Sequence, residues 1–174
     1  MPNHVKNVLK FNKLKPDDIE TIVNMIAVES DTEPKTYHID FNKIIPEPRF
    51  ESECPDDCKV NKDSHVEEDI DRPWFDWYKW RNKYWDTKWN AYDSYSKVGK
   101  SYIIFVFSTA WSMPYSIIER LQLLGYQFEL RYADEAIGSN CGILTYSREQ
   151  GFTHYDESEL TRPEEFARRL WNTY

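Results

Sequence analysis

The segment Tyr102 to Phe107 is an unbroken run of apolar residues, and it constrains the fold more than any other part of the sequence. A short run that is rich in aromatic and β-branched residues is typical of a strand buried on both faces. We therefore expect the central strand of a sheet here. Residues 89–97 are predicted to form the strand before it, with a turn near Gly99.

Helices are predicted before and after this strand pair in the sequence. Pro16 suits the first turn of a helix. The apolar residues that follow recur at the spacing of one buried helix face: Ile19, Ile22, Val23, Ile26 and Ala27. A second helix is expected to open at residues 71–73. Ser112 is expected to cap a third helix that stops at Gly125, because glycine tolerates the left-handed conformation of such a stop. A C-terminal helix is expected to begin at Arg162.

Further strands are predicted from alternating or β-rich segments at residues 3–13, 36–41 and 126–132, and a last hairpin at residues 142–155. The resulting order of strands and helices matches a ferredoxin-like βαββαβ unit, an α+β fold whose helices cover one face of an antiparallel sheet. We expect one domain over residues 1–174, with an insertion at 47–89, made of an acidic loop and an aromatic helix, and a C-terminal extension at 148–174.

The chain of 174 residues has a net charge of −8 that is unevenly spread. Residues 47–72 hold 10 acidic and 4 basic residues, residues 74–100 hold 3 and 6, and residues 126–160 hold 7 and 2. An acidic protein is a poor candidate for non-specific duplex binding, which needs clustered Lys and Arg. The acidic blocks are expected either to be solvated or to face a basic partner.

Several classes of protein are not expected. No apolar run reaches the length of a membrane span, and the first residues lack the pattern of a signal peptide. The three cysteines suggest a reduced, cytoplasmic protein. No motif for a cofactor or a catalytic triad is present, so we expect neither a cofactor nor an enzyme.

Five short segments are similar to one known family. They are residues 1–5 (Met-Pro-Asn-His-Val), 39–46 (Ile-Asp-Phe-Asn-Lys-Ile-Ile-Pro), 87–93 (Thr-Lys-Trp-Asn-Ala-Tyr-Asp), 107–112 (Phe-Ser-Thr-Ala-Trp-Ser) and 132–135 (Tyr-Ala-Asp-Glu). In this order they resemble the YubB-type ferredoxin-like proteins of phages and plasmids, a group of Api92-like proteins without a known activity.

This resemblance implies a ferredoxin-like fold and a mobile genetic element as the setting, and it implies no reaction. It extends from residue 1 to about residue 147. The acidic stretch 47–72 and the tail after Ser147 are not part of the pattern, so we expect features particular to this protein there.

The aromatic helix supplies the main candidate binding residues, which are Trp74, Trp77, Trp80, Arg81 and Trp85. Three interpretations stay open: the rings pack in the core or under a lid, they form a protein interface, or they stack on single-stranded nucleic acid. Asp134 and Glu135, at the end of a predicted strand, are further interface candidates.

Metal sites are weaker candidates. Cys54 and Cys58 have the spacing of zinc ligands and His65 is near in sequence, but a fourth ligand is missing, so we predict no metal site. Asp40 and Asp93, with the two acids of residues 134–135, would resemble a magnesium nuclease site only if they met in space.

We therefore expect a non-catalytic protein-binding module of a mobile element, such as an inhibitor of a host defence or nucleic-acid-processing complex, with a host protein as partner. Binding of single-stranded nucleic acid through the Trp-rich basic helix is the alternative. The sequence leaves the oligomeric state open.

Overall fold

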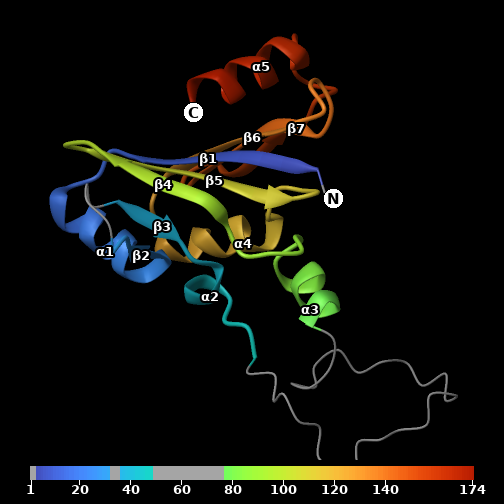
Figure 1. The fold of residues 1–174 in the computed structure, drawn as a ribbon. Helices are drawn as coiled ribbons and strands as arrows, with labels where there is room; N and C mark the ends of the chain where they lie inside the picture. Colours follow the sequence, from blue (N-terminus) through green and yellow to red (C-terminus); the bar gives the residue numbers. More distant parts are fainter. Residues whose placement is uncertain (1–2, 32–35, 49–76) are drawn as a thin grey trace, which may run out of the picture.

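In a computed structural model, which describes residues 3–31, 36–48 and 77–174, the protein is α+β with an antiparallel sheet of six strands in the order β4-β5-β1-β6-β7-β8 (Figure 1). Their bounds are β1 His4–Asn12, β4 Tyr92–Val98, β5 Tyr102–Ala110, β6 Phe128–Asp134, β7 Cys141–Ser147 and β8 Gly151–Tyr155.

The apolar run at residues 102–107 lies in β5, as predicted, between β4 and β1. Successive side chains of a strand point to opposite faces of the sheet, and both faces are buried here. Phe105 belongs to one core cluster and its neighbours Ile104 and Val106 to another, on the other face.

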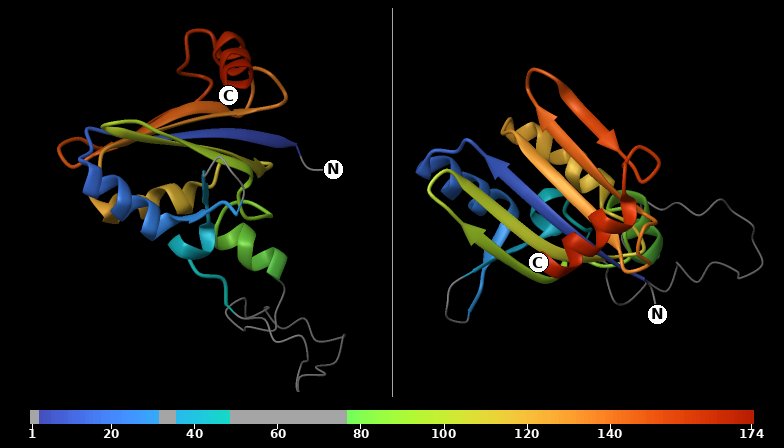
Figure 2. Two further views of the ribbon diagram at one scale, coloured as in Figure 1. Left: turned by 60° about the vertical axis from the view of Figure 1, so that its left-hand side comes forward. Right: turned by 90° about the horizontal axis from the view of Figure 1, so that it is seen from above.

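The larger core lies between the sheet and the helices on one face. These are α1 (Pro16–Ile26) and α4 (Tyr115–Arg120), which continues as a 3-10 helix, Leu121–Leu124 (Figure 2). The start of α1 follows the prediction, because Pro16 is in its first turn and the carboxylate of Asp18 accepts a hydrogen bond from the Lys15 N–H at 2.7 Å. The stop at Gly125 is also confirmed, with a φ of 73°.

Helix α5 (Pro163–Thr173) lies on the opposite face of the sheet, as both views in Figure 2 show. Its buried residues Ala167 and Leu170 pack with Val8 and Ile104 in the second core cluster. The indole N–H of Trp171 donates to the backbone carbonyl of Asp134 at 3.1 Å. The sheet face that a bare ferredoxin-like unit would expose is therefore covered at these strands.

The predicted strand at residues 36–41 is not part of this sheet. Only Tyr37–Ile39 is extended, as β3, and it pairs with β2 (Ala27–Glu29) in a separate two-stranded sheet. β3 lies against β4 through serine side chains instead of a backbone ladder: Tyr37 N–H donates to Ser96 Oγ at 2.8 Å, and Ile39 N–H to Ser94 Oγ at 3.3 Å. The strand ends where the Asp40 side chain caps the next helix.

The predicted cap of the third helix is also wrong. Ser112 Oγ donates to the backbone carbonyl of Asp86, and α4 begins three residues later. The carboxylate of Asp86 accepts a hydrogen bond from Ser116 N–H at 2.6 Å. A residue far away in the sequence thus satisfies the start of α4, and no local pattern reveals such a partner.

Between the small sheet and β4, the described residues form two short helices. They are α2 (Phe41–Ile44) and α3 (Trp77–Tyr84). The acidic stretch with Cys54, Cys58 and His65, and Trp74 before α3, lie outside the described residues. No helix in the described ranges is long and apolar enough to span a membrane.

Candidate functional site

Three aromatic rings gather around one lysine where β1 begins and β5 ends, and a fourth ring contacts one of the three. The Lys88 ammonium lies 4.9 Å from the ring centre of Trp89, 5.6 Å from that of Trp111 and 5.8 Å from that of Tyr78. The Trp77 ring contacts Tyr78 edge-on, with 5.9 Å between centres. We call Trp77, Tyr78, Lys88, Trp89 and Trp111 the aromatic surface.

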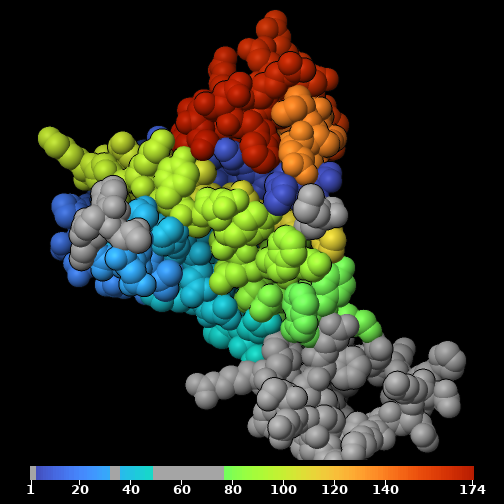
Figure 3. Space-filling view, in the orientation of Figure 1, coloured from blue at the N-terminus to red at the C-terminus, as the bar shows by residue number. Residues whose placement is uncertain are grey.

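Three of these rings are unusually open to solvent. The exposed fraction is 43% for Trp77, 38% for Tyr78 and 41% for Trp111. In Figure 3, α3 and the segment that leads to β4 form one continuous green area on the face turned toward the viewer. Exposed aromatic residues that lie side by side mark interaction sites far more often than single exposed residues do.

The fold holds Trp111 in a strained conformation. Its φ is 71°, a left-handed value that costs a bulky residue about 1–3 kcal/mol. Two hydrogen bonds fix its backbone: Trp111 N–H donates to Asn3 O at 2.9 Å, and the Asn140 side chain donates to Trp111 O at 2.8 Å. Three separate segments thus cooperate to direct this ring outward.

Helix α3 divides the residues that the sequence predicts for binding into an exposed and a buried group. Trp77 is exposed, whereas Trp80 is 6% exposed and Trp85 is fully buried. The Trp85 indole N–H donates to the Ile45 carbonyl at 3.0 Å. These two tryptophans pack in the core, so the interpretation of the whole helix as a stacking platform does not hold for them.

The guanidinium group of Arg81 is bonded within the protein. It forms two hydrogen bonds to the Glu47 carboxylate, at 2.8 and 2.7 Å, and lies 4.9 Å from the Trp77 ring centre and 5.2 Å from that of Trp85. This ion pair ties α3 to the chain just after α2. Its bonds to Glu47 leave Arg81 little capacity to bind an external phosphate.

Asp134 and Glu135 lie beside the aromatic surface, and both have bonds within the fold. Asp134 is 4% exposed, and its carboxylate accepts hydrogen bonds from the Ala136 N–H at 2.7 Å and the Asn140 amide at 3.1 Å. Glu135 accepts from the His4 N–H at 3.1 Å. The Asp134 carboxylate therefore organises the loop that supports Trp111 and offers little surface to a partner.

A tyrosine next to the aromatic surface has a perturbed pKa. Burial, together with the charges of Asp93 and Glu135, raises the pKa of Tyr92 to about 12. The hydroxyl lies 2.6 Å from His4 Nδ1 and donates to the Thr109 carbonyl at 3.2 Å. The neutral hydroxyl thus joins the first strand to the end of β5.

Four of the segments that carry the family resemblance meet at this end of the sheet. Asn3 contacts both Trp111 and Asp134, and the Thr87 hydroxyl exchanges two hydrogen bonds with Ala110, each of 3.0 Å. The fifth segment joins them where the Asn90 amide donates to Asp40 at 2.8 Å. The shared segments therefore build the frame that holds the aromatic surface.

The carboxylates considered for magnesium do not assemble. Asp40 caps α2, with its Oδ1 accepting from Asn42 N–H at 3.0 Å. Within the described ranges, no group of three His, Cys, Asp or Glu side chains is placed to hold a metal ion.

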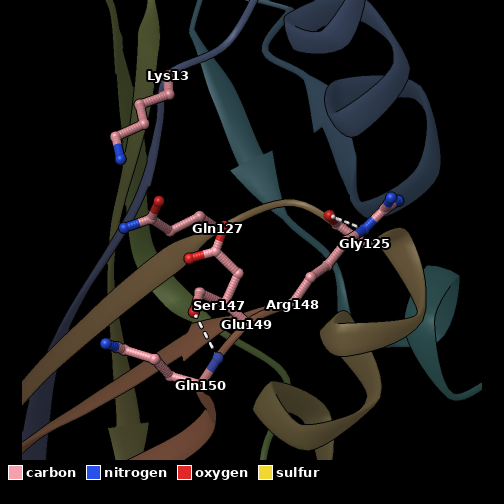
Figure 4. Close-up of a pocket in the computed structure, with 7 residues that line it drawn as sticks. All are labelled: Lys13, Gly125, Gln127, Ser147, Arg148, Glu149 and Gln150. Atoms are coloured by element: carbon pink, nitrogen blue, oxygen red, sulfur yellow. Dashed lines mark hydrogen bonds between the residues drawn. The ribbon is translucent and has the colours of Figure 1, made fainter.

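A separate cavity lies at the other end of the sheet. It has a volume of about 440 Å³ and is lined by one glycine and six residues with polar or charged side chains (Figure 4): Lys13, Gly125, Gln127, Ser147, Arg148, Glu149 and Gln150. Arg148 Nε donates to the Gly125 carbonyl at 2.9 Å. The lining mixes both signs of charge, most of its residues are exposed, and none of them has a hydrophobic or aromatic side chain of the kind that is typical of small-molecule sites.

The sequence predictions missed Trp89 and Trp111 as members of the aromatic surface. Lys88, Trp89 and Trp111 lie in the segments that carry the family resemblance, but nothing in their spacing shows that they meet. The signal for Trp111 is positional: it directly follows the buried strand, where a large aromatic residue has no core left to enter.

Comparison with known proteins gives one match. The family described as the ferredoxin-like domain in Api92-like protein matches residues 84–173, just over half of the chain. No curated protein and no solved structure is similar enough to count as a relative. The match runs through α5, so the tail after Ser147, expected to fall outside the family pattern, is included in it. The chain therefore belongs to the Api92-like family and contains its ferredoxin-like domain.

Proposed function

We propose that this protein is a non-catalytic protein-binding module of a mobile genetic element and that it binds its partner through the aromatic surface. An inhibitor of a host defence or nucleic-acid-processing complex is the kind of activity we infer. The observation that carries the proposal is the group of three exposed rings, Trp77, Tyr78 and Trp111: the last two lie against Lys88, and Trp77 contacts Tyr78.

Two physical arguments support a protein as the partner. Tryptophan and tyrosine are enriched among the few residues that supply most of the energy of protein interfaces. Rings that are already fixed lose little conformational entropy on binding, and the backbone bonds of Trp111 supply that preorganisation.

Single-stranded nucleic acid is the alternative ligand, because bases stack on exposed aromatic rings. Only part of the residues expected for this function are available, since Trp80 and Trp85 are buried and Arg81 is paired with Glu47. The net charge of −8 also opposes a polyanion. Helix α5 covers the sheet face that related folds use for RNA.

We also infer that β1, α1, β4, β5, α4 and β6 are the βαββαβ unit of this protein. The assignment is supported by the order of the sheet, in which the four strands of this unit are neighbours: β4, β5, β1 and β6. The residues between α1 and β4, with the Trp-rich helix, are then an insertion into that unit.

Affinity capture from a host lysate tests the function. The tagged protein is compared with a Trp77→Ala/Trp111→Ala variant and with a Leu123→Ala/Tyr155→Ala control, whose exposed residues lie on other elements. We expect the wild type and the control to capture the same partner protein after nuclease treatment. The Trp variant should fail to capture it. Equal capture by all three proteins would contradict the proposal, and recovery of nucleic acid alone would favour the alternative.

A further inference from the structure

The chemistry of the aromatic surface points to the kind of protein segment that it binds. Lys88 is held by three rings, and in the part of the chain that the structure describes no carboxylate pairs with it. An ammonium group has three N–H donors, and ring faces satisfy its charge without accepting conventional hydrogen bonds. The donors of Lys88 are therefore available to a ligand with oxygen acceptors.

Arg81 shows the same arrangement in a completed form. Its cation also lies over two aromatic rings, those of Trp77 and Trp85, and the Glu47 carboxylate closes the arrangement with a bidentate ion pair. Lys88 has the cation and the rings, but no carboxylate from the described residues occupies the corresponding place. The internal comparison indicates an external carboxylate as the missing group.

Charge supports an acidic ligand. The segment from Trp77 to Asn90 contains four basic residues, Lys79, Arg81, Lys83 and Lys88, and one acidic residue, Asp86. This gives a net charge of +3, or +2 when the Glu47 carboxylate on Arg81 is included, within a chain of −8. Charge complementarity of this kind steers an acidic partner to one face and fixes its orientation.

A carboxylate fits better than the phosphates of a nucleic acid strand. Tyr92 packs edge-on against Trp89, with 5.9 Å between ring centres, and its pKa is raised in part by the charges of Asp93 and Glu135. Acidic groups therefore flank the aromatic surface on this side. A continuous polyanion would meet them, whereas one or two carboxylates on a peptide would reach Lys88 alone.

We infer that the aromatic surface binds an acidic peptide segment of a partner protein, with a carboxylate on Lys88 and neighbouring apolar side chains on the rings of Trp77, Tyr78 and Trp111. The inference rests on the proposed function and adds the chemistry of the partner to it.

NMR of the indole N–H groups tests this inference. The probes are a short peptide that alternates Asp and Glu with Leu and Phe, the same peptide with Asn and Gln in place of the acids, and an oligothymidylate. The acidic peptide is expected to shift the indole signals of Trp77, Trp89 and Trp111. The Trp85 signal stays in place, because its N–H is bonded to Ile45.

Two lysine variants separate the ion pair from general charge. Lys88→Gln is expected to weaken binding of the acidic peptide about tenfold, the lower range for loss of a desolvated pair. Lys97→Gln removes a lysine that also lies over rings, Tyr95 and Tyr174, on a different face, and is expected to leave the affinity unchanged. Added salt is expected to weaken the acidic peptide only.

Several results would overturn the inference. They are equal binding of the amide peptide, no effect of Lys88→Gln, no shift with the acidic peptide, or shifts of the three signals with oligothymidylate alone. Shifts that depend on protein concentration without a probe would identify a second copy of the chain as the occupant. A captured partner that is lost with the Trp77→Ala/Trp111→Ala variant and kept with Lys88→Gln would leave the proposed function standing without this inference.

Discussion

Trp111 combines a strained backbone with an exposed ring, and the two effects can be weighed against each other. A glycine at φ 71° removes a strain of about 1–3 kcal/mol. It also loses the contacts with Tyr78 and Lys88, each worth about 0.5–1.5 kcal/mol. A strained backbone that holds a side chain in place is characteristic of functional sites.

We expect Trp111→Gly to change the free energy of unfolding by less than about 1 kcal/mol, because these two effects nearly cancel. Trp85→Ala, at a fully buried ring, should cost about 3–5 kcal/mol. Urea denaturation of both variants measures the difference. A loss at Trp111 as large as that at Trp85 would show that the ring serves the core.

Because the pKa of Tyr92 is raised in the folded protein, we expect a loss of stability in alkaline solution. This folded pKa of about 12 exceeds the value near 10 of an unfolded tyrosine, mainly because of burial. The folded state therefore binds the proton more tightly, and this stabilisation is complete below about pH 10 and is lost as the pH rises toward 12.

Tyr92→Phe should make the fall in unfolding free energy above about pH 10 less steep, as measured by urea midpoints at a series of pH values. Part of the fall should remain, since burial also raises the pKa of Tyr132. An unchanged slope in Tyr92→Phe would contradict the assignment.

At the scale of the elements, α4 depends on a residue outside its own segment. The Asp86 carboxylate bonds to Ser116 N–H at 2.6 Å, and Asp86 itself has a φ of 59°. Asp86→Ala should cost about 2 kcal/mol, the sum of a lost cap and of alanine in a left-handed conformation.

Asp86→Asn is the matched control, because asparagine accepts the same bond and tolerates the same backbone. It should stay close to the wild type in thermal or urea unfolding. If both variants lose equal stability, the charge of Asp86 matters more than its capping geometry.

Helix α5 protects the second core, and Cys141 reports on it. Cys141 is buried, and burial raises the pKa of its thiol, so it should react slowly with a thiol reagent. In a Cys54→Ser/Cys58→Ser background, Leu170→Ala should accelerate the reaction at least about tenfold, because the helix opens more often. Leu123→Ala, at an exposed site, should have no effect. Equal rates in both variants would mean that α5 does not protect Cys141.

At the scale of the whole molecule, patterns within single elements were predicted well and contacts between distant elements were not. The apolar run of β5, the buried face of α1 and the stop at Gly125 are local and follow from periodicity and glycine chemistry. The separate sheet of β2 and β3 and the cap of α4 by Asp86 depend on partners far away in sequence.

The same limit applies to the candidate site. Composition pointed to the aromatic helix, and Trp77 is an exposed member of the surface. Spacing alone does not show that Trp80 and Trp85 are buried, because the helix carries aromatic residues on several sides. The pairing of β4 with β5 brings Trp111, which follows β5, close to Lys88 and the other residues that precede β4.

The most direct measurement is site-specific photo-crosslinking to a captured partner. A photoreactive phenylalanine analogue replaces Tyr78 in the aromatic surface, or the exposed Tyr155 on β8 as a control. We expect a crosslinked partner from position 78 and none from position 155. Crosslinking from position 155 alone would contradict the claim that the aromatic surface is the interaction site.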